Sequence, residues 1–304
     1  MPIARSTQQG FTLIELITVM VITGIIAGMV ALFIRVPIQS YVDNVARAEL
    51  SDLADTSLRR MTRDLRLALP NSVRLSGDGK YLEFLLTKTG GRYLAEEDEL
   101  GGNVLSFSGT SGNPLVFDIV GNVPTGRQAI AGGDYIVVYN LGPGFYPADA
   151  YDCRGEAPNR ICNRATVVSL VGNTVTMADN PFRNQNLTTE AASFPSPTSR
   201  FQVVTTPVTY YCNGGTNGQL VRYSGYPIQA SQPINASAAP LATAPVQARV
   251  ADRVKSCVFS FSSLPNVQRG LVNLLITFNS GKADLDLVNE TLTLQQSVHI
   301  DNAP

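Results

Sequence analysis

Hydrophobic residues are distributed unevenly along the chain, and the longest apolar run lies close to its N-terminus. Residues 16–34 are nineteen positions without a charge, which as a helix extend about 28 Å, enough to cross the apolar part of a bilayer. A secretory signal peptide has a shorter apolar core, about 7–15 residues, followed by a small-residue cleavage site. No clear site of that kind follows this run, so the pattern predicts a membrane-spanning helix.

Arg5 is the only charged residue before Glu15, and a basic residue on this side of the span weakly favours a cytoplasmic N-terminus. Everything after Arg35 is then expected to lie outside the cytoplasm.

A second helical pattern occupies residues 40–69. Pro70 disfavours helical geometry at Leu69 and predicts the end of the helix there, while Pro37 predicts a bend or loosening just beyond the apolar run. Joined together, the two segments predict one long helix, half in lipid and half packed on a globular head. Apolar residues recur in the second segment every three to five positions, at Val42, Val45, Leu50, Leu53, Leu58, Met61 and Leu65.

After Asn71 the pattern changes to short β-like runs, which predict a mostly antiparallel β head. Glycine pairs at residues 90–91, 101–102, 132–133 and 214–215 are expected to be turns. Residues 180–199 and 226–248 are rich in proline, alanine, serine and asparagine and are expected to be mobile surface loops. The expected strands are residues 80–86, 114–120, 134–141, 165–171, 173–178, 200–212, 219–224, 257–262, 271–278 and 290–300.

Length and charge narrow the range of functions. The chain has 304 residues, enough for a sizeable core, and its net charge of −1 gives no electrostatic basis for nucleic-acid binding. We therefore expect no nucleic acid among the partners.

Four cysteines all lie in the expected extracytoplasmic part, where an even number predicts two disulfides. Four cysteines allow three pairings. Cys153 with Cys162 and Cys212 with Cys257 is the favoured one, because short loops close most easily.

The stretch GFTLIEL at residues 10–16 resembles the processing site of type IV prepilins and of the pseudopilins of type II secretion. In that family a membrane peptidase cuts after the glycine and methylates the new N-terminal amine. The resemblance places the cut between Gly10 and Phe11 and makes Glu15 the acidic fifth residue of the mature chain. A plain signal anchor that happens to contain Glu15 is the alternative.

Electrostatics explains why such a motif pairs an acid with a new amine. A carboxylate in hydrocarbon costs roughly 2.5–3.5 kcal/mol on insertion scales, and opposite charges attract far more strongly in a medium of low dielectric constant than in water. Glu15 of one subunit is therefore expected to neutralise the Phe11 amine of a neighbour and to fix the axial register of assembly.

Three further stretches, at residues 61–75, 133–144 and 297–304, are similar to the MshO type of minor pilin of the mannose-sensitive haemagglutinin (MSHA) pilus system. J-type pseudopilins and W-type minor pilins are the nearest rivals. The resemblance implies the α+β type IV pilin fold, in which a long N-terminal helix packs on a mostly antiparallel β head. The implied segments are a leader at residues 1–10, a membrane helix at 11–36, an amphipathic continuation at 37–70 and a β-rich head at 71–304.

The same resemblance implies a subunit that primes or joins pilus assembly, with a type II secretion pseudopilin or an adhesive tip subunit as alternatives. The implied partners are a prepilin peptidase, other major and minor pilins, the inner-membrane assembly platform and the lipid bilayer. The expected location is the bacterial inner membrane, with the head in the periplasm, and then the pilus.

No catalytic or metal-binding constellation is expected from the sequence. His299 is the single histidine and lies far in sequence from the cysteines, and no P-loop, H-E-x-x-H or G-x-S-x-G pattern occurs. We therefore expect neither an enzyme nor a cofactor.

Overall fold

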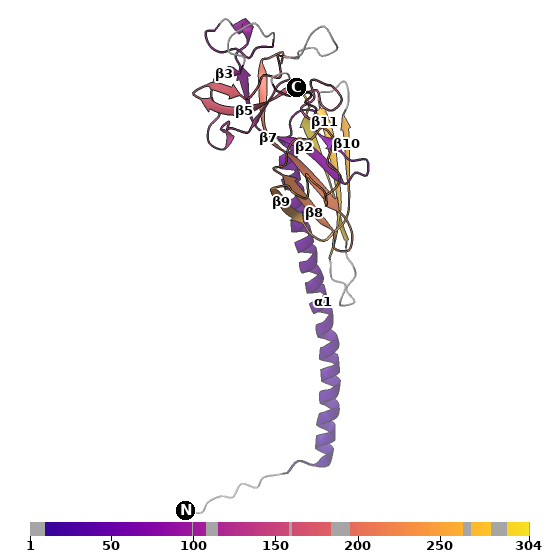
Figure 1. Ribbon diagram of the computed structural model, residues 1–304. Helices are drawn as coiled ribbons and strands as arrows, with labels where there is room; N and C mark the ends of the chain where they lie inside the picture. Colours follow the sequence, from indigo (N-terminus) through magenta and orange to yellow (C-terminus); the bar gives the residue numbers. More distant parts are fainter. Residues whose placement is uncertain are drawn as a thin grey trace, which may run out of the picture.

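The computed structural model describes residues 10–98, 100–107, 115–157, 160–183, 195–263, 269–280 and 291–303. A long helix, α1, projects from a β-rich head (Figure 1). It runs without interruption over Leu13–Arg66, with Pro37 inside it. The predicted fusion of the apolar and amphipathic segments into one helix is therefore confirmed, and no break marks the proline.

Helix α1 ends at Arg66, slightly before the predicted position. The amide of Leu67 donates to the Asp64 carbonyl and that of Ala68 to the Leu65 carbonyl, both at 3.1 Å, so the last turn tightens. The amide of Leu69 then donates to the carbonyl of Leu85 at 2.8 Å. This hydrogen bond to the strand that contains Leu85 therefore ends the helix a few residues before Pro70.

The head-proximal half of α1 buries one face, with the four-residue spacing of Ala46, Leu50 and Ala54. The predicted stripe is confirmed at Leu50, Leu58, Met61 and Leu65, which are buried, but not at Val45, which is 38% exposed. The two alanines have the small side chains that let the sheet approach the helix closely, and a pattern of large apolar residues does not reveal them.

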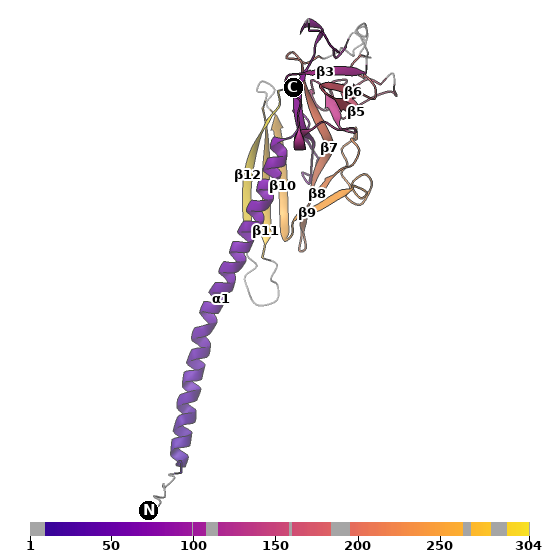
Figure 2. The ribbon, with the colours of Figure 1, turned by 90° about the vertical axis from the view of Figure 1, so that its left-hand side faces the viewer.

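Within the described residues, the strands form an antiparallel nine-stranded sheet and an antiparallel three-stranded sheet. The larger sheet has the order β1-β2-β3-β6-β5-β4-β7-β8-β9, and the smaller has the order β10-β11-β12 (Figures 1 and 2). The expected α+β fold, a long N-terminal helix on an antiparallel β head, is confirmed. The strands are β1 (Arg74–Leu75), β2 (Tyr81–Tyr93), β3 (Val116–Val120), β4 (Tyr135–Val137), β5 (Arg164–Val171), β6 (Thr174–Met177), β7 (Arg200–Asn213), β8 (Gln219–Ser224), β9 (Val246–Ala251), β10 (Val254–Ser263), β11 (Arg269–Asn279) and β12 (Thr291–Asp301).

The larger sheet closes on itself at the end of the head that lies farther from the membrane helix, because β2 also pairs with β7. The circuit runs from β2 through β3, β6, β5 and β4 to β7 and back. Its interior holds a separate apolar cluster that includes Phe117, Val175 and Phe201. The two long strands β2 and β7 thus belong both to this closed circuit and to the part of the larger sheet that packs near α1.

Gly90 and Gly91 were expected to form a turn, and this prediction is wrong: both lie within β2. A Cβ on Gly90 would lie 2.9 Å from the carbonyl oxygen of Phe201, and one on Gly91 would lie 2.8 Å from the Phe201 ring. The two glycines therefore permit close approach of β2 to β7.

The smaller sheet packs one face on α1. Its inward residues, such as Leu274 and Ile276 of β11, join Leu50 and Met61 of the helix in the largest apolar cluster of the head. Figure 2 shows α1 running alongside these strands, with β12 at the edge of the sheet.

Residues 226–248 were expected to be mobile and coreless, and here the structure differs. Tyr226, Leu241 and Ala244 of this segment are buried against Tyr81 and Tyr223. The segment also ends in β9, which the sequence did not predict. Of the second expected loop, residues 184–194 lie outside the described residues.

Candidate functional site

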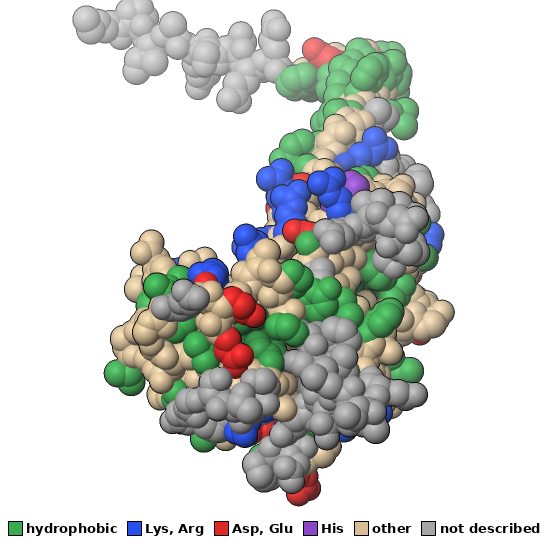
Figure 3. Space-filling view, turned by 90° about the horizontal axis from the view of Figure 1, so that it is seen from above, with side chains coloured by type: hydrophobic (Ala, Val, Ile, Leu, Met, Phe, Trp, Pro, Cys, Tyr) green, Lys and Arg blue, Asp and Glu red, His purple; other side chains and the backbone are tan. Residues whose placement is uncertain are grey.

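The apolar half of α1 packs against no described part of the chain. Leu13–Ile34 is long and apolar enough to cross a membrane, and none of it is buried against the described parts of the chain. Phe11, just before the helix, is 80% exposed, and Phe33 near the end of the span is equally exposed. Seen from above, the apolar end of the helix extends away from the head (Figure 3). Such a surface requires lipid or other helices to cover it.

Gly10, Phe11 and Thr12 lie outside the helix. Thr12 is the N-cap residue and has an extended backbone, with φ −80° and ψ 149°. Gly10 is exposed, and no described residue other than its chain neighbour lies within 4 Å of a Cβ placed on it. The bond between Gly10 and Phe11 therefore lies in an accessible segment directly before the first helical turn.

Glu15 lies in that first turn, and its amide donates to the Thr12 carbonyl at 3.1 Å. The positive end of the helix dipole favours a carboxylate there. No described residue hydrogen-bonds to the Glu15 side chain or forms an ion pair with it. Its carboxylate is thus available to a cation from outside the described chain.

Residues 5–31 match the prokaryotic N-terminal methylation motif. The N-terminus is type IV prepilin-like. Such a motif implies processing by a prepilin peptidase, assembly with other pilins and anchoring of the helix in a membrane. No curated protein and no solved structure matches the chain.

A buried carboxylate fixes the prepilin-like helix to the head. Asp64 of α1 accepts hydrogen bonds from the hydroxyl of Tyr210 on β7, at 2.9 Å, and from Nε of Arg222 on β8, at 2.8 Å. Burial, with the nearby Asp64 carboxylate, raises the pKa of Tyr210, so its hydroxyl remains a donor. The helix is therefore held to two strands at a defined axial position and rotation.

A second buried carboxylate links residues 226–248 to the larger sheet. Glu83 of β2 is fully buried and accepts hydrogen bonds from Arg74 and from the hydroxyl of Tyr226. Burial raises the pKa of Glu83, while Arg74 and Tyr226 oppose that rise. Arg74 also lies over the Tyr151 ring, 3.5 Å from its centroid, and donates to the Ala230 carbonyl. This network explains why residues 226–248 are fixed to the sheet.

The cysteines form the two favoured pairs, Cys153–Cys162 and Cys212–Cys257. The second pair links β7 of the larger sheet to β10 of the smaller one. Both pairs lie in the head, far along the chain from Gly10, Phe11 and Glu15.

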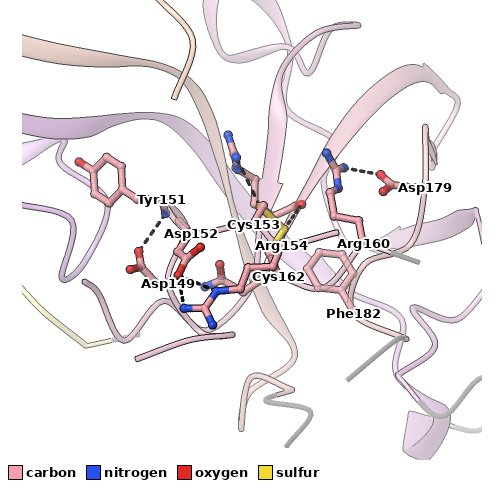
Figure 4. The surroundings of a disulfide bond; sticks show 12 residues. Asp149, Tyr151, Asp152, Cys153, Arg154, Arg160, Cys162, Asp179 and Phe182 are labelled. Carbon is pink, nitrogen blue, oxygen red and sulfur yellow. Dashed lines mark hydrogen bonds and ion pairs between the residues drawn. A yellow bond between two sulfur atoms is a disulfide. The ribbon is translucent and has the colours of Figure 1, made fainter. Parts of the chain in front are cut away.

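The first pair closes a short loop (Figure 4). Arg154 and Ile161, each next to one of the cysteines, exchange backbone hydrogen bonds. Beside it, Arg154 pairs with Asp152 at 2.7 Å. The Arg154 guanidinium also lies 4.0 Å from the centroid of the Tyr146 ring. The disulfide thus closes a locally stabilised loop.

Sequence reasoning did not identify Asp64, Arg74, Glu83 or Arg222. A charged residue in an amphipathic pattern is normally assigned to the solvent face. Only the tertiary structure buries the carboxylates of Asp64 and Glu83 and brings the partly buried Arg222 and Arg74 against them. His299 lies exposed on β12. Among the described residues, no three His, Cys, Asp or Glu side chains are grouped so as to hold a metal ion.

Proposed function

We propose that this protein is a minor pilin of the MshO type, which is cut between Gly10 and Phe11 and then takes part in assembling an MSHA-type pilus. The observation that carries the proposal is the bare helix Leu13–Ile34, which follows an accessible glycine and is continuous with a helix anchored in a folded head. A filament subunit needs both parts, because the helix packs in the filament interior while the head faces outward.

Glu15 supports the proposal because its carboxylate has no partner among the described residues. Its carboxylate costs free energy in hydrocarbon unless a cation neutralises it, and the new amine at Phe11 of an adjoining subunit is such a cation. The pairing favours one axial offset between subunits, so an incoming chain enters the filament in register.

The proposed segments follow the expected boundaries: a leader at residues 1–10, a membrane helix at 11–36, its amphipathic continuation at 37–70 and a head at 71–304. The head is expected in the periplasm before assembly. Both disulfides fit that location, because disulfides persist in oxidising compartments.

The test is the mass of the mature chain after production with an active prepilin peptidase. We expect an N-terminus at Phe11 that carries one methyl group. Gly10→Val is expected to block the cut, because a branched side chain obstructs an extended backbone in a tight cleft. Gly28→Val is the matched control: apart from its own helical turn, no described residue lies within 4 Å of a Cβ placed on Gly28, and its substitution should leave processing unchanged.

An N-terminus that retains residues 1–10 under these conditions contradicts the proposal and favours a plain signal anchor. Within the proposal, deletion phenotypes separate the roles. Loss of all pili indicates priming, normal pili that fail to attach indicate an adhesive tip subunit, and a defect confined to protein secretion indicates a pseudopilin.

A further inference from the structure

Within the described residues, the three-stranded sheet has one open edge. On its other side, the amide of Phe259 in β10 donates to the carbonyl of Gly79, and Cys257 of β10 is joined to Cys212. Strand β12 pairs with β11 alone, and no described residue pairs with its outer edge. Figure 2 shows β12 as the outermost strand of this sheet.

This edge lacks the features by which proteins usually prevent strand addition. Exposed edges are commonly protected by lysine, proline, a bulge or a very short strand. Strand β12 contains no proline and no lysine, and its one formally charged side chain is Asp301 at its last position. The register of β12 on β11 is regular over the whole strand, from Thr291 to Asp301. The edge is therefore suited to accept another strand.

A groove runs between this edge and α1. One hollow of about 600 Å³ lies between the helix and Leu294, Gln295 and Gln296 of β12. A second hollow, of about 410 Å³, lies farther down the same boundary, next to Arg47 and Thr291. The hollows provide space beside the edge for the side chains of an added strand.

The helix wall of this groove is basic. Its lining includes Arg47, Arg59, Arg63 and Arg66. Its acidic residue, Asp55, pairs with Arg59 at 2.7 Å, and Arg63 lies 3.8 Å from the carboxylate of Asp64. Basic side chains gather where the helix meets the head (Figure 3). The β12 wall is uncharged, so the groove has a net positive charge that complements an acidic occupant.

The spacing of the arginines specifies the occupant further. Arg59 and Arg63 are one helical turn apart, about 6 Å along the axis. Side chains on one face of a strand repeat every ~6.7 Å. A strand with an acidic residue at alternate positions would therefore present carboxylates at nearly the spacing of the arginines.

We propose that the outer edge of β12 accepts an extended segment from the head of another pilin, with Asp or Glu at alternate positions, which adds to the sheet as a fourth strand. The inference rests on the proposed function, since it names the surface through which the assembly subunit contacts a neighbour. Backbone hydrogen bonds supply affinity, and the arginines of α1 select an acidic strand.

The first experiment uses the full-length chain in detergent micelles and three fluorescent eleven-residue peptides. One alternates Asp with Val, one alternates Lys with Val, and one has the composition of the first with its Asp residues clustered. We expect the alternating acidic peptide to bind and to slow hydrogen exchange in β12. The other two peptides should bind at least about tenfold more weakly.

Charge reversal tests the role of the arginines. Arg59→Glu combined with Arg63→Glu should weaken binding of the acidic peptide about tenfold or more. Arg127→Glu is the matched control, because Arg127 is an exposed arginine that does not line the groove. Equal binding by the charge-reversed chain, or exchange protection outside β12, would overturn the proposal.

The second experiment places a photocrosslinking residue at Gln295 in cells that produce the pilus. A crosslink to an acidic, extended segment of another pilin head supports the proposal, and a crosslink to a second copy of this chain, or to a neutral or basic segment, overturns it. The N-terminus is determined on the same material. A methylated Phe11 without peptide binding contradicts only the docking surface, whereas an unprocessed chain contradicts the assembly role.

Discussion

Replacing Asp64 by alanine tests whether a buried carboxylate fixes the membrane helix to the head. The change leaves the Tyr210 hydroxyl without its acceptor and the Arg222 guanidinium without its counter-charge. An unsatisfied buried hydroxyl costs about 1–3 kcal/mol, and an unpaired buried charge costs about 3–5 kcal/mol. Arg222 keeps a hydrogen bond to Ser224 and its side chain is 12% exposed, which reduces the second cost. We expect Asp64→Ala to lower the free energy of unfolding by about 4 kcal/mol.

The assay is urea unfolding of the full-length chain in micelles, followed by tyrosine fluorescence because the chain has 11 tyrosines and no tryptophan. Asp55→Ala is the matched control on the same helix. Asp55 also pairs with an arginine, Arg59, but the two side chains are 54% and 79% exposed. A surface pair one turn apart on a helix contributes only about 0.3–0.5 kcal/mol, so this variant should be nearly neutral.

A double variant separates the ion pair from general packing. Asp64→Ala combined with Arg222→Met removes both charges, so its loss of stability should be smaller than that of Asp64→Ala alone. The reasoning is refuted if Asp64→Ala lowers the free energy of unfolding no more than Asp55→Ala does. It is also refuted if the effects of Asp64→Ala and Arg222→Met on the free energy of unfolding are additive.

Three further predictions concern the N-terminus, a disulfide and the response to acid. Glu15→Ala should leave processing intact but reduce co-assembly with partner pilins, measured by co-purification; unchanged co-assembly would contradict the register role. Replacing Cys212 and Cys257 by alanine should lower the free energy of unfolding by about 4 kcal/mol, and replacing the pair with the shorter loop should lower it by about 3 kcal/mol. Equal losses in urea unfolding would argue against loop entropy as the cause. Burial raises the pKa of Asp118, but hydrogen bonds from Thr174 and Asn103 outweigh it and leave the pKa below its usual value. Its stabilising contribution is therefore present above about pH 4 and lost as the pH falls through the lower folded-state pKa, so Asp118→Asn should flatten the acid end of the stability profile.

The sequence alone predicted the elements in which a single local signal dominates. The apolar run and the helical period of residues 40–69 indicated α1, and alternating β-branched and aromatic residues indicated long strands such as β7 and β11. Gly10, Phe11 and Glu15 could be proposed as site residues from the sequence because the motif that contains them is contiguous.

Features that depend on contacts between distant segments could not be predicted. Gly90 and Gly91 indicate a turn until the ring of Phe201 is placed beside them. The composition of residues 226–248 indicates a loop, and only the buried pair of Glu83 with Arg74, together with the Tyr226 hydroxyl, holds that loop on the sheet. The open edge of β12 likewise follows from strand order, which the sequence does not encode locally.

Because α1 is uninterrupted, the orientation of the head determines where Glu15 lies. Among the side chains of α1 that the structure describes, Ala46 is the buried one nearest the membrane end, and Glu15 lies 31 residues below it, a distance of about 47 Å. Over that length, a tilt of one degree displaces the carboxylate by about 0.8 Å, so a few degrees exceed the reach of an ion pair. In the proposed assembly, the angle between neighbouring heads would therefore determine whether Glu15 of one subunit reaches the Phe11 amine of the next.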